Sequence, residues 1–172
     1  MTGRSLIVNA LYFLLFLALQ VIFFLNLSFA NYAFCFIYIG FLLLLPVEIP
    51  PLTLLILSFF LGLSIDVFYN TLGIHTAACV LIGYIRPYLI NFLTPRGGYD
   101  EGAELTVFSL GFPWLAAYAS ILVVVHHITL FMIEAWEFDT FFLTLLKALC
   151  SALFTLVVYF LLQYLVFSRQ SK

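Results

Sequence analysis

Long apolar runs, separated by short turn-forming segments, determine the solvent in which this chain can fold. Hydrophobic residues make up 66% of the 172 residues, and Asp, Glu, Lys and Arg together only 8%. A soluble domain carries about 25% charged residues. Because the runs are continuously apolar rather than alternating, they predict membrane-spanning helices and not the strands of a barrel.

The lengths of the runs predict an all-α integral membrane protein, with one domain and six transmembrane helices. A span needs about 20 apolar residues to cross a hydrocarbon core of about 30 Å. The first run is longer than the apolar region of a secretory signal, so we expect it to be retained. The six runs lie near residues 6–25, 29–48, 52–69, 74–93, 113–133 and 141–167.

The second run is the weakest of the six as a span. Its most apolar part, residues 32–45, covers about 21 Å as a helix, which is shorter than the hydrocarbon core. The run either extends over residues 29–48 and spans, or is re-entrant. We favour the spanning helix.

Basic residues predict the orientation, because cytoplasmic loops of membrane proteins are enriched in Lys and Arg. With six spans, one side receives the N-terminus, the loop after the fourth helix and the C-terminus, whereas the acidic segment 134–139 falls on the other side. Both termini are therefore expected in the cytoplasm. The basic residues on that side are Arg4, Arg86, Arg96, Arg169 and Lys172.

Small and polar residues recur at helical spacing within three of the runs. Such faces let membrane helices approach one another closely, so we expect them to be packing faces. The three sets are Ser58, Gly62, Asp66 and Asn70; His75, Cys79 and Gly83; and Lys147, Ser151 and Thr155.

Five ionisable residues are expected toward the outer half of the membrane, where a charge is costly. Three interpretations compete: hydrogen bonds and ion pairs between helices, a ligand or proton pathway, and a metal site. We favour the structural interpretation, with Asp66 paired to Lys147 or to a histidine. Two adjacent histidines point about 100° apart on a helix, which is poor geometry for chelation. The five are Asp66, His75, His126, His127 and Lys147.

Catalytic and nucleic-acid-binding signatures are missing from the sequence. It contains no GxSxG, no HExxH and no P-loop pattern, and its net charge is −2 without a basic run. We therefore expect no enzymatic activity, no cofactor, no metal site and no nucleic-acid partner.

The stretch FLGLSIDVFYNTLG, residues 60–73, resembles the signature of the MreD family of bacterial rod shape-determining membrane proteins. The family pattern has a glycine, a short apolar gap, an aspartate and a leucine-glycine turn before the next helix. Residues 81–84 resemble the family's apolar-Gly-Tyr step, and the early Gln20 also agrees. The resemblance covers about 25 residues and marks Gly62, Asp66, Asn70, Gly73 and Gly83 as motif and helix-packing residues.

The resemblance implies a non-enzymatic scaffold in the bacterial cytoplasmic membrane, acting in rod shape and peptidoglycan synthesis. It implies MreC, a RodA-type glycosyltransferase with its transpeptidase and, indirectly, the MreB filament as partners. The implied fold is similar to the S component of energy-coupling-factor transporters. The 21 phenylalanines and the acidic outer segment depart from the family pattern. Two alternatives remain: a vitamin-binding S component, and a small membrane enzyme of lipid metabolism.

Overall fold

The computed structural model describes residues 3–29, 32–99, 104–135 and 140–167, and it is helical apart from one very short hairpin. The segments of the predicted outer loop beyond Ala135 and the predicted basic residues Arg169 and Lys172 lie outside these ranges, as does the side chain of Arg4. The elements are α1 (Gly3–Leu19), the π-helical turn η1 (Gln20–Phe24), β1 (Ser28–Phe29), β2 (Ala33–Phe34), α2 (Ile39–Leu44), α3 (Pro51–Tyr69), α4 (Ile74–Phe92), α5 (Val107–Leu110), α6 (Phe112–Ala135) and α7 (Phe141–Phe167).

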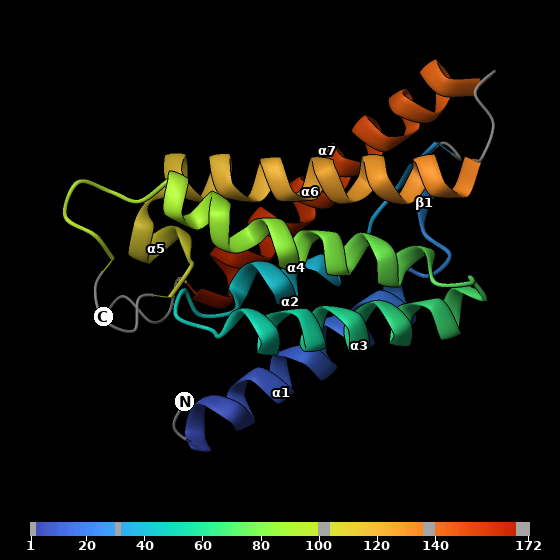
Figure 1. Cartoon of the computed structure of the whole chain (residues 1–172). Coiled ribbons are helices and arrows are strands. Elements are labelled where there is room, and N and C mark those ends of the chain that lie inside the picture. The colour runs from blue at the N-terminus through green and yellow to red at the C-terminus, as the bar shows by residue number, and fades with distance from the viewer. Residues whose placement is uncertain (1–2, 30–31, 100–103, 136–139, 168–172) are drawn as a thin grey trace.

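Five long helices surround a central stretch of chain that contains β2 and α2 (Figure 1). α3 packs against α4, α4 against α6 and α6 against α7, while α1 contacts α2 and α3. α1 begins and α7 ends at the same end of this bundle, which we call the basal end. The opposite end, where α3 turns into α4, is the apical end (Figure 1).

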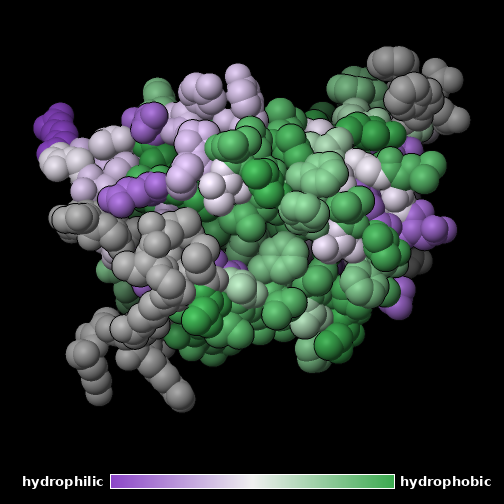
Figure 2. Space-filling view, turned by 60° about the horizontal axis from the view of Figure 1, so that its bottom comes forward, coloured by the Kyte–Doolittle hydropathy of each residue, from purple (hydrophilic) through white to green (hydrophobic). Residues whose placement is uncertain are grey.

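Four helices of the described chain are long and apolar enough to cross a membrane. They are α1 with η1, α3, α6 and α7. Many large apolar side chains on these helices are exposed, and Figure 2 shows apolar residues across the middle of one face with polar residues toward its ends. A belt of this kind fits lipid, so the chain is an all-α membrane protein.

The second predicted run differs most from expectation. A helix over residues 29–48 is wrong, because only the six residues of α2 are α-helical and the chain before them is extended or irregular. This central segment, residues 33–45, returns from the apical to the basal end inside the ring of helices (Figure 1). Side chains from Cys35 to Leu43 are buried. Non-helical backbone is tolerated at membrane depth only where protein encloses it.

The other five predicted runs are helices in the structure, with ends shifted by at most three residues. α3 opens with Pro51 in its first turn, where the missing N–H would have no helical partner in any case. α4 continues through Pro87, and its buried His75 and Arg86 make it less apolar than its neighbours. Together these helices form the walls around the central segment.

Candidate functional site

The residues of the predicted family motif build the tight turn between α3 and α4. Asn70 ends α3 in the left-handed conformation, with φ of 54°, and Gly73 precedes α4 with φ of 89°. Only glycine adopts such angles without strain, and asparagine is among the residues that tolerate them best. The motif therefore ends one helix and starts the next within a few residues.

Gly62 and Gly83 allow α3 and α4 to lie in close contact. A Cβ atom on Gly62 would lie 2.7 Å from the backbone nitrogen of Thr76 and 2.8 Å from the carbonyl oxygen of His75. A Cβ atom on Gly83 would overlap the hydroxyl group of Ser58. Both glycines are thus interface positions, as their small size predicts for membrane helices.

Asp66 joins the two helices through the free N–H groups at the start of α4. Its carboxylate accepts hydrogen bonds from the backbone N–H of His75 at 3.0 Å and of Thr76 at 2.9 Å. The hydroxyl groups of Thr71 and Thr76 each donate to it at 2.5 Å. The first N–H groups of a helix have no partner within the helix and favour a negative charge. Asp66 is therefore an N-terminal cap supplied by the preceding helix.

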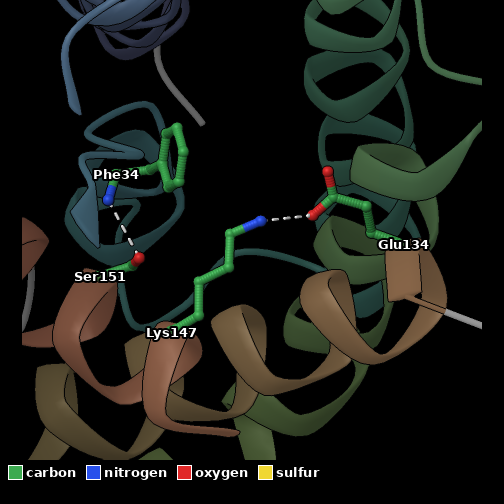
Figure 3. A network of polar contacts seen from close by, with 4 residues as sticks. All are labelled: Phe34, Glu134, Lys147 and Ser151. Carbon is green, nitrogen blue, oxygen red and sulfur yellow. Dashed lines mark hydrogen bonds and ion pairs between the residues drawn. The ribbon is translucent and has the colours of Figure 1, made fainter. Parts of the chain in front are cut away.

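The expected pair between Asp66 and Lys147 is wrong. Lys147 instead pairs with Glu134, with Nζ 3.3 Å from Oε2 (Figure 3). The same ammonium group lies 4.4 Å from the ring centre of Phe131 and 5.0 Å from that of Phe34. Lys147 is thus partly exposed near the apical end, where its charge meets an acid and two aromatic faces.

Three polar side chains bind the backbone of the central segment. Gln20 donates to the carbonyl of Cys35 at 3.1 Å and accepts from the N–H of Tyr38 at 3.4 Å. Ser151 and Thr155, both on α7, accept from the N–H groups of Phe34 and Phe36 at 3.0 Å. The predicted Ser151 and Thr155 face therefore satisfies extended backbone as well as packing helices. Gln20 was noted only for its resemblance to the family, and its structural role was missed.

Two of the predicted histidines meet at one phenol. The Tyr38 hydroxyl lies 2.8 Å from Nδ1 of His75 and 2.9 Å from Nε2 of His126. A phenol has one proton, so it donates to one imidazole and accepts from the other. Tyr38 belongs to the central segment, which is thereby bound to α4 and α6.

His127 continues the network toward α7. Its Nδ1 lies 2.8 Å from the carbonyl oxygen of Val123, which can only accept, so Nδ1 carries the proton. Its Nε2 then accepts from the hydroxyl of Thr155 at 3.0 Å, and that hydroxyl accepts from Phe36 N–H. A chain of matched donors and acceptors links α6, α7 and the central segment.

The middle of this polar cluster is filled by the chain itself. The Phe36 ring lies 5.4 Å, centre to centre, from the rings of His75 and of His127, and 6.4 Å from that of His126. Within the part of the chain that the structure describes, no three His, Cys, Asp or Glu residues converge to hold a metal ion. Three of the five predicted residues thus surround Phe36, Asp66 adjoins them through the backbone of His75, and Lys147 lies apart.

Arg86 lies in the interior of α4 and not in the basal loop with Arg96, so its predicted position is wrong. Its side chain is only 1% exposed. Nε donates to the Tyr118 hydroxyl at 2.7 Å, and the guanidinium also donates to the carbonyls of Leu45 and Pro46. No carboxylate among the described residues pairs with it. Its charge therefore faces the last carbonyls after α2, which attract a cation.

Helical spacing was the signal that could have located Arg86. It follows Cys79 and Gly83 on one face of α4, and both of those residues are buried. A basic residue that continues a buried face is enclosed with it, whatever its distance from the next loop. Loop assignment from charge alone overlooked this.

Comparisons with known proteins found no match: no family model, no curated protein and no solved structure is similar to this chain.

Proposed function

We propose that this chain is a membrane scaffold of the MreD type, acting in rod shape maintenance and peptidoglycan synthesis. Its partners would be MreC, a RodA-type glycosyltransferase with its transpeptidase and, indirectly, MreB. The observation that carries the proposal is the α3–α4 hairpin, in which Gly62, Asp66 and Gly73 each have a defined structural task. A scaffold works through a fixed surface, and this motif fixes one.

The use of the polar groups supports a non-enzymatic role. Asp66, His127 and Arg86 are occupied by hydrogen bonds to backbone, hydroxyl or phenol groups. A catalytic acid, base or nucleophile has to reach a substrate. These side chains instead hold helices and the central segment together.

The proposal includes six crossings, with the central segment as the second and α4 as the fourth. The basal end would face the cytoplasm of a bacterial cell, because exposed Arg96 lies in the loop after α4. Both termini would then be cytoplasmic. The arrangement would be similar to the S component of energy-coupling-factor transporters.

The alternative is a vitamin-binding S component. That function would need space among the apical polar side chains, and Phe36 and Tyr38 fill the region between the three histidines. This packing favours the scaffold over the transporter. A ligand would have to displace part of the central segment.

Depletion in a rod-shaped host, followed by complementation, tests the proposal. Loss of the chain should produce round or widened cells without any new vitamin requirement. Gly62→Ala should fail to restore shape, because its Cβ would meet the backbone of α4. Gly97→Ala is the control, since nothing lies within 4 Å of its added Cβ, and should restore shape. Normal cell shape after depletion, with reduced vitamin uptake, would support the transporter instead.

A further inference from the structure

The ring of helices has a groove on its basal half, between α1 and α7. Its floor is Leu44 of α2, which belongs to the central segment. The groove thus leads from the lipid-facing surface to the interior of the bundle. It is lined by Tyr12, Leu15, Phe16, Leu19, Leu44, Tyr159, Leu162, Gln163 and Val166.

The lining changes from polar to apolar along the helix axes. Gln163 lies four residues before the end of α7, which places it about 6 Å from the basal end of that helix. Farther from the basal end, α1 contributes Leu15, Phe16 and Leu19, which carry no polar atoms. An amphiphile whose polar part stays near the basal end matches this gradient.

Two buried amide atoms near the basal part of the groove have no hydrogen-bond partner. One is Oε1 of Gln163, a residue that is only 1% exposed. The other is Nδ2 of Asn9, which precedes Tyr12 by one turn on the same face of α1. A buried amide without a partner costs about 1–3 kcal/mol, so both atoms favour a polar ligand.

The Gln163 amide can present either of its ends to a ligand. Its Nε2 lies 2.8 Å from the hydroxyl of Tyr159. The two orientations of an amide have the same shape, and in the reversed one Oε1 accepts the Tyr159 proton while Nε2 becomes free to donate. With Asn9 Nδ2, the groove then offers two N–H donors. An ester carbonyl needs donors of this kind.

We propose that this groove binds one acyl chain of a membrane lipid from the basal leaflet. The chain lies along Leu15, Phe16 and Leu19, and its ester carbonyl accepts hydrogen bonds at the depth of Asn9 and Gln163. A lone water molecule fits less well, since an ordered buried water makes two to four polar contacts and the lining is otherwise apolar. The site does not depend on the scaffold function, and its test is separate.

Photolabelling of the full chain in lipid vesicles tests the site. The purified protein is reconstituted in phosphatidylethanolamine and phosphatidylglycerol, with a trace of phosphatidylcholine that carries a diazirine on one acyl chain. Labelled peptides are identified by mass spectrometry. Labelling should concentrate on residues 12–19 and 159–166 rather than around Leu153, which is an exposed lipid-facing residue of α7.

Matched variants separate a site from general lipid contact. Leu15→Trp should fill the groove and reduce labelling there, whereas Leu153→Trp, the control on the outer face of α7, should leave it unchanged. Replacing both amides, Asn9→Leu with Gln163→Leu, should lower labelling at limiting probe by about fivefold or more, the effect of losing at least one hydrogen bond. Leu15→Phe replaces Leu15→Trp if the larger side chain prevents folding.

Three results would overturn the proposal. The first is equal labelling of the groove and the Leu153 face, which would mean that only general lipid contact occurs. The second is labelling of the groove that both amide replacements leave unchanged. The third is cross-linking between two copies of the chain through the groove, which would make it a protein interface.

Discussion

At the scale of single residues, Asp66 shows how this chain carries a charge at membrane depth without a partner of opposite charge. Two backbone N–H groups and two hydroxyl groups donate to its carboxylate, and the side chain is 3% exposed. Hydrogen bonds to a charged group contribute about 1.5–3 kcal/mol each. The carboxylate therefore compensates for its burial through the start of α4.

Asp66→Asn should lower the free energy of unfolding by about 1–3 kcal/mol, because an amide NH₂ group would face donors. Unfolding in mixed micelles with increasing dodecyl sulfate measures the change. Glu134→Gln is the control, since Glu134 forms a partly exposed ion pair and should cost less than about 1 kcal/mol. Equal losses for the two variants would contradict the assignment of Asp66 as a helix cap.

Asp66→Asn and Lys147→Met should be additive when combined. The two residues have different partners, and residues that share none usually add within about 0.5 kcal/mol. The same unfolding assay on the double variant measures the coupling. A coupling above about 1 kcal/mol would restore the ion pair that the sequence predicts and the structure lacks.

Arg86→Met should lower the free energy of unfolding by about 2–4 kcal/mol. The variant leaves the buried carbonyls of Leu45 and Pro46, and the Tyr118 hydroxyl, without their common donor. Arg86→Lys should recover only part of this loss, because an ammonium group lacks the planar fork of donors. Arg96→Met, at an exposed position, is the control and should stay within about 0.5 kcal/mol of the parent.

At the scale of elements, the central segment explains why polar side chains occur inside the bundle. Its backbone N–H and C=O groups cannot all pair with one another as they do in a helix, and lipid offers them no partner. Gln20 supplies a donor and an acceptor from η1, and Ser151 and Thr155 supply acceptors from α7. The polar positions of the helices thus follow from the irregular backbone that they surround.

Thr155→Val should lower the free energy of unfolding by about 1–3 kcal/mol, because Phe36 N–H loses its acceptor and His127 loses its donor. Thr129→Val is a matched control, since the Thr129 hydroxyl only donates to Val125 within its own helix. It should have little effect in the same assay. A larger loss for Thr129→Val than for Thr155→Val would contradict the role of α7 in holding the central segment.

Hydropathy predicted α3, α6 and α7 well because each is one long apolar run with a polar or proline-containing break at its end. It failed for residues 29–48 because composition measures burial and not hydrogen bonding: the segment is fully apolar and yet not one helix. Its partners Ser151 and Thr155 lie 117 and 119 residues away from Phe34 and Phe36. No local pattern could show that pairing, and the same holds for Glu134 as the partner of Lys147.

At the scale of the whole molecule, the chain is a ring of five helices around a crossing segment that is largely not helical. α3 with α4 forms the most intimate contact, through Gly62, Gly83 and Asp66. The outer surface is apolar, whereas the charged groups at depth face inward toward backbone atoms. A rigid body of this kind suits the scaffold role proposed above.

The central claim is that the segment between α1 and α3 crosses the membrane within the ring. Single cysteines at Tyr32, exposed near the apical end, and at Glu48, exposed before α3, test it directly in a Cys150→Ala background. A membrane-impermeant maleimide should label the Tyr32→Cys variant in intact cells, and the Glu48→Cys variant only after the membrane is permeabilised. Labelling of both variants from the same side would show that the segment enters and leaves on one side, and would contradict the claim.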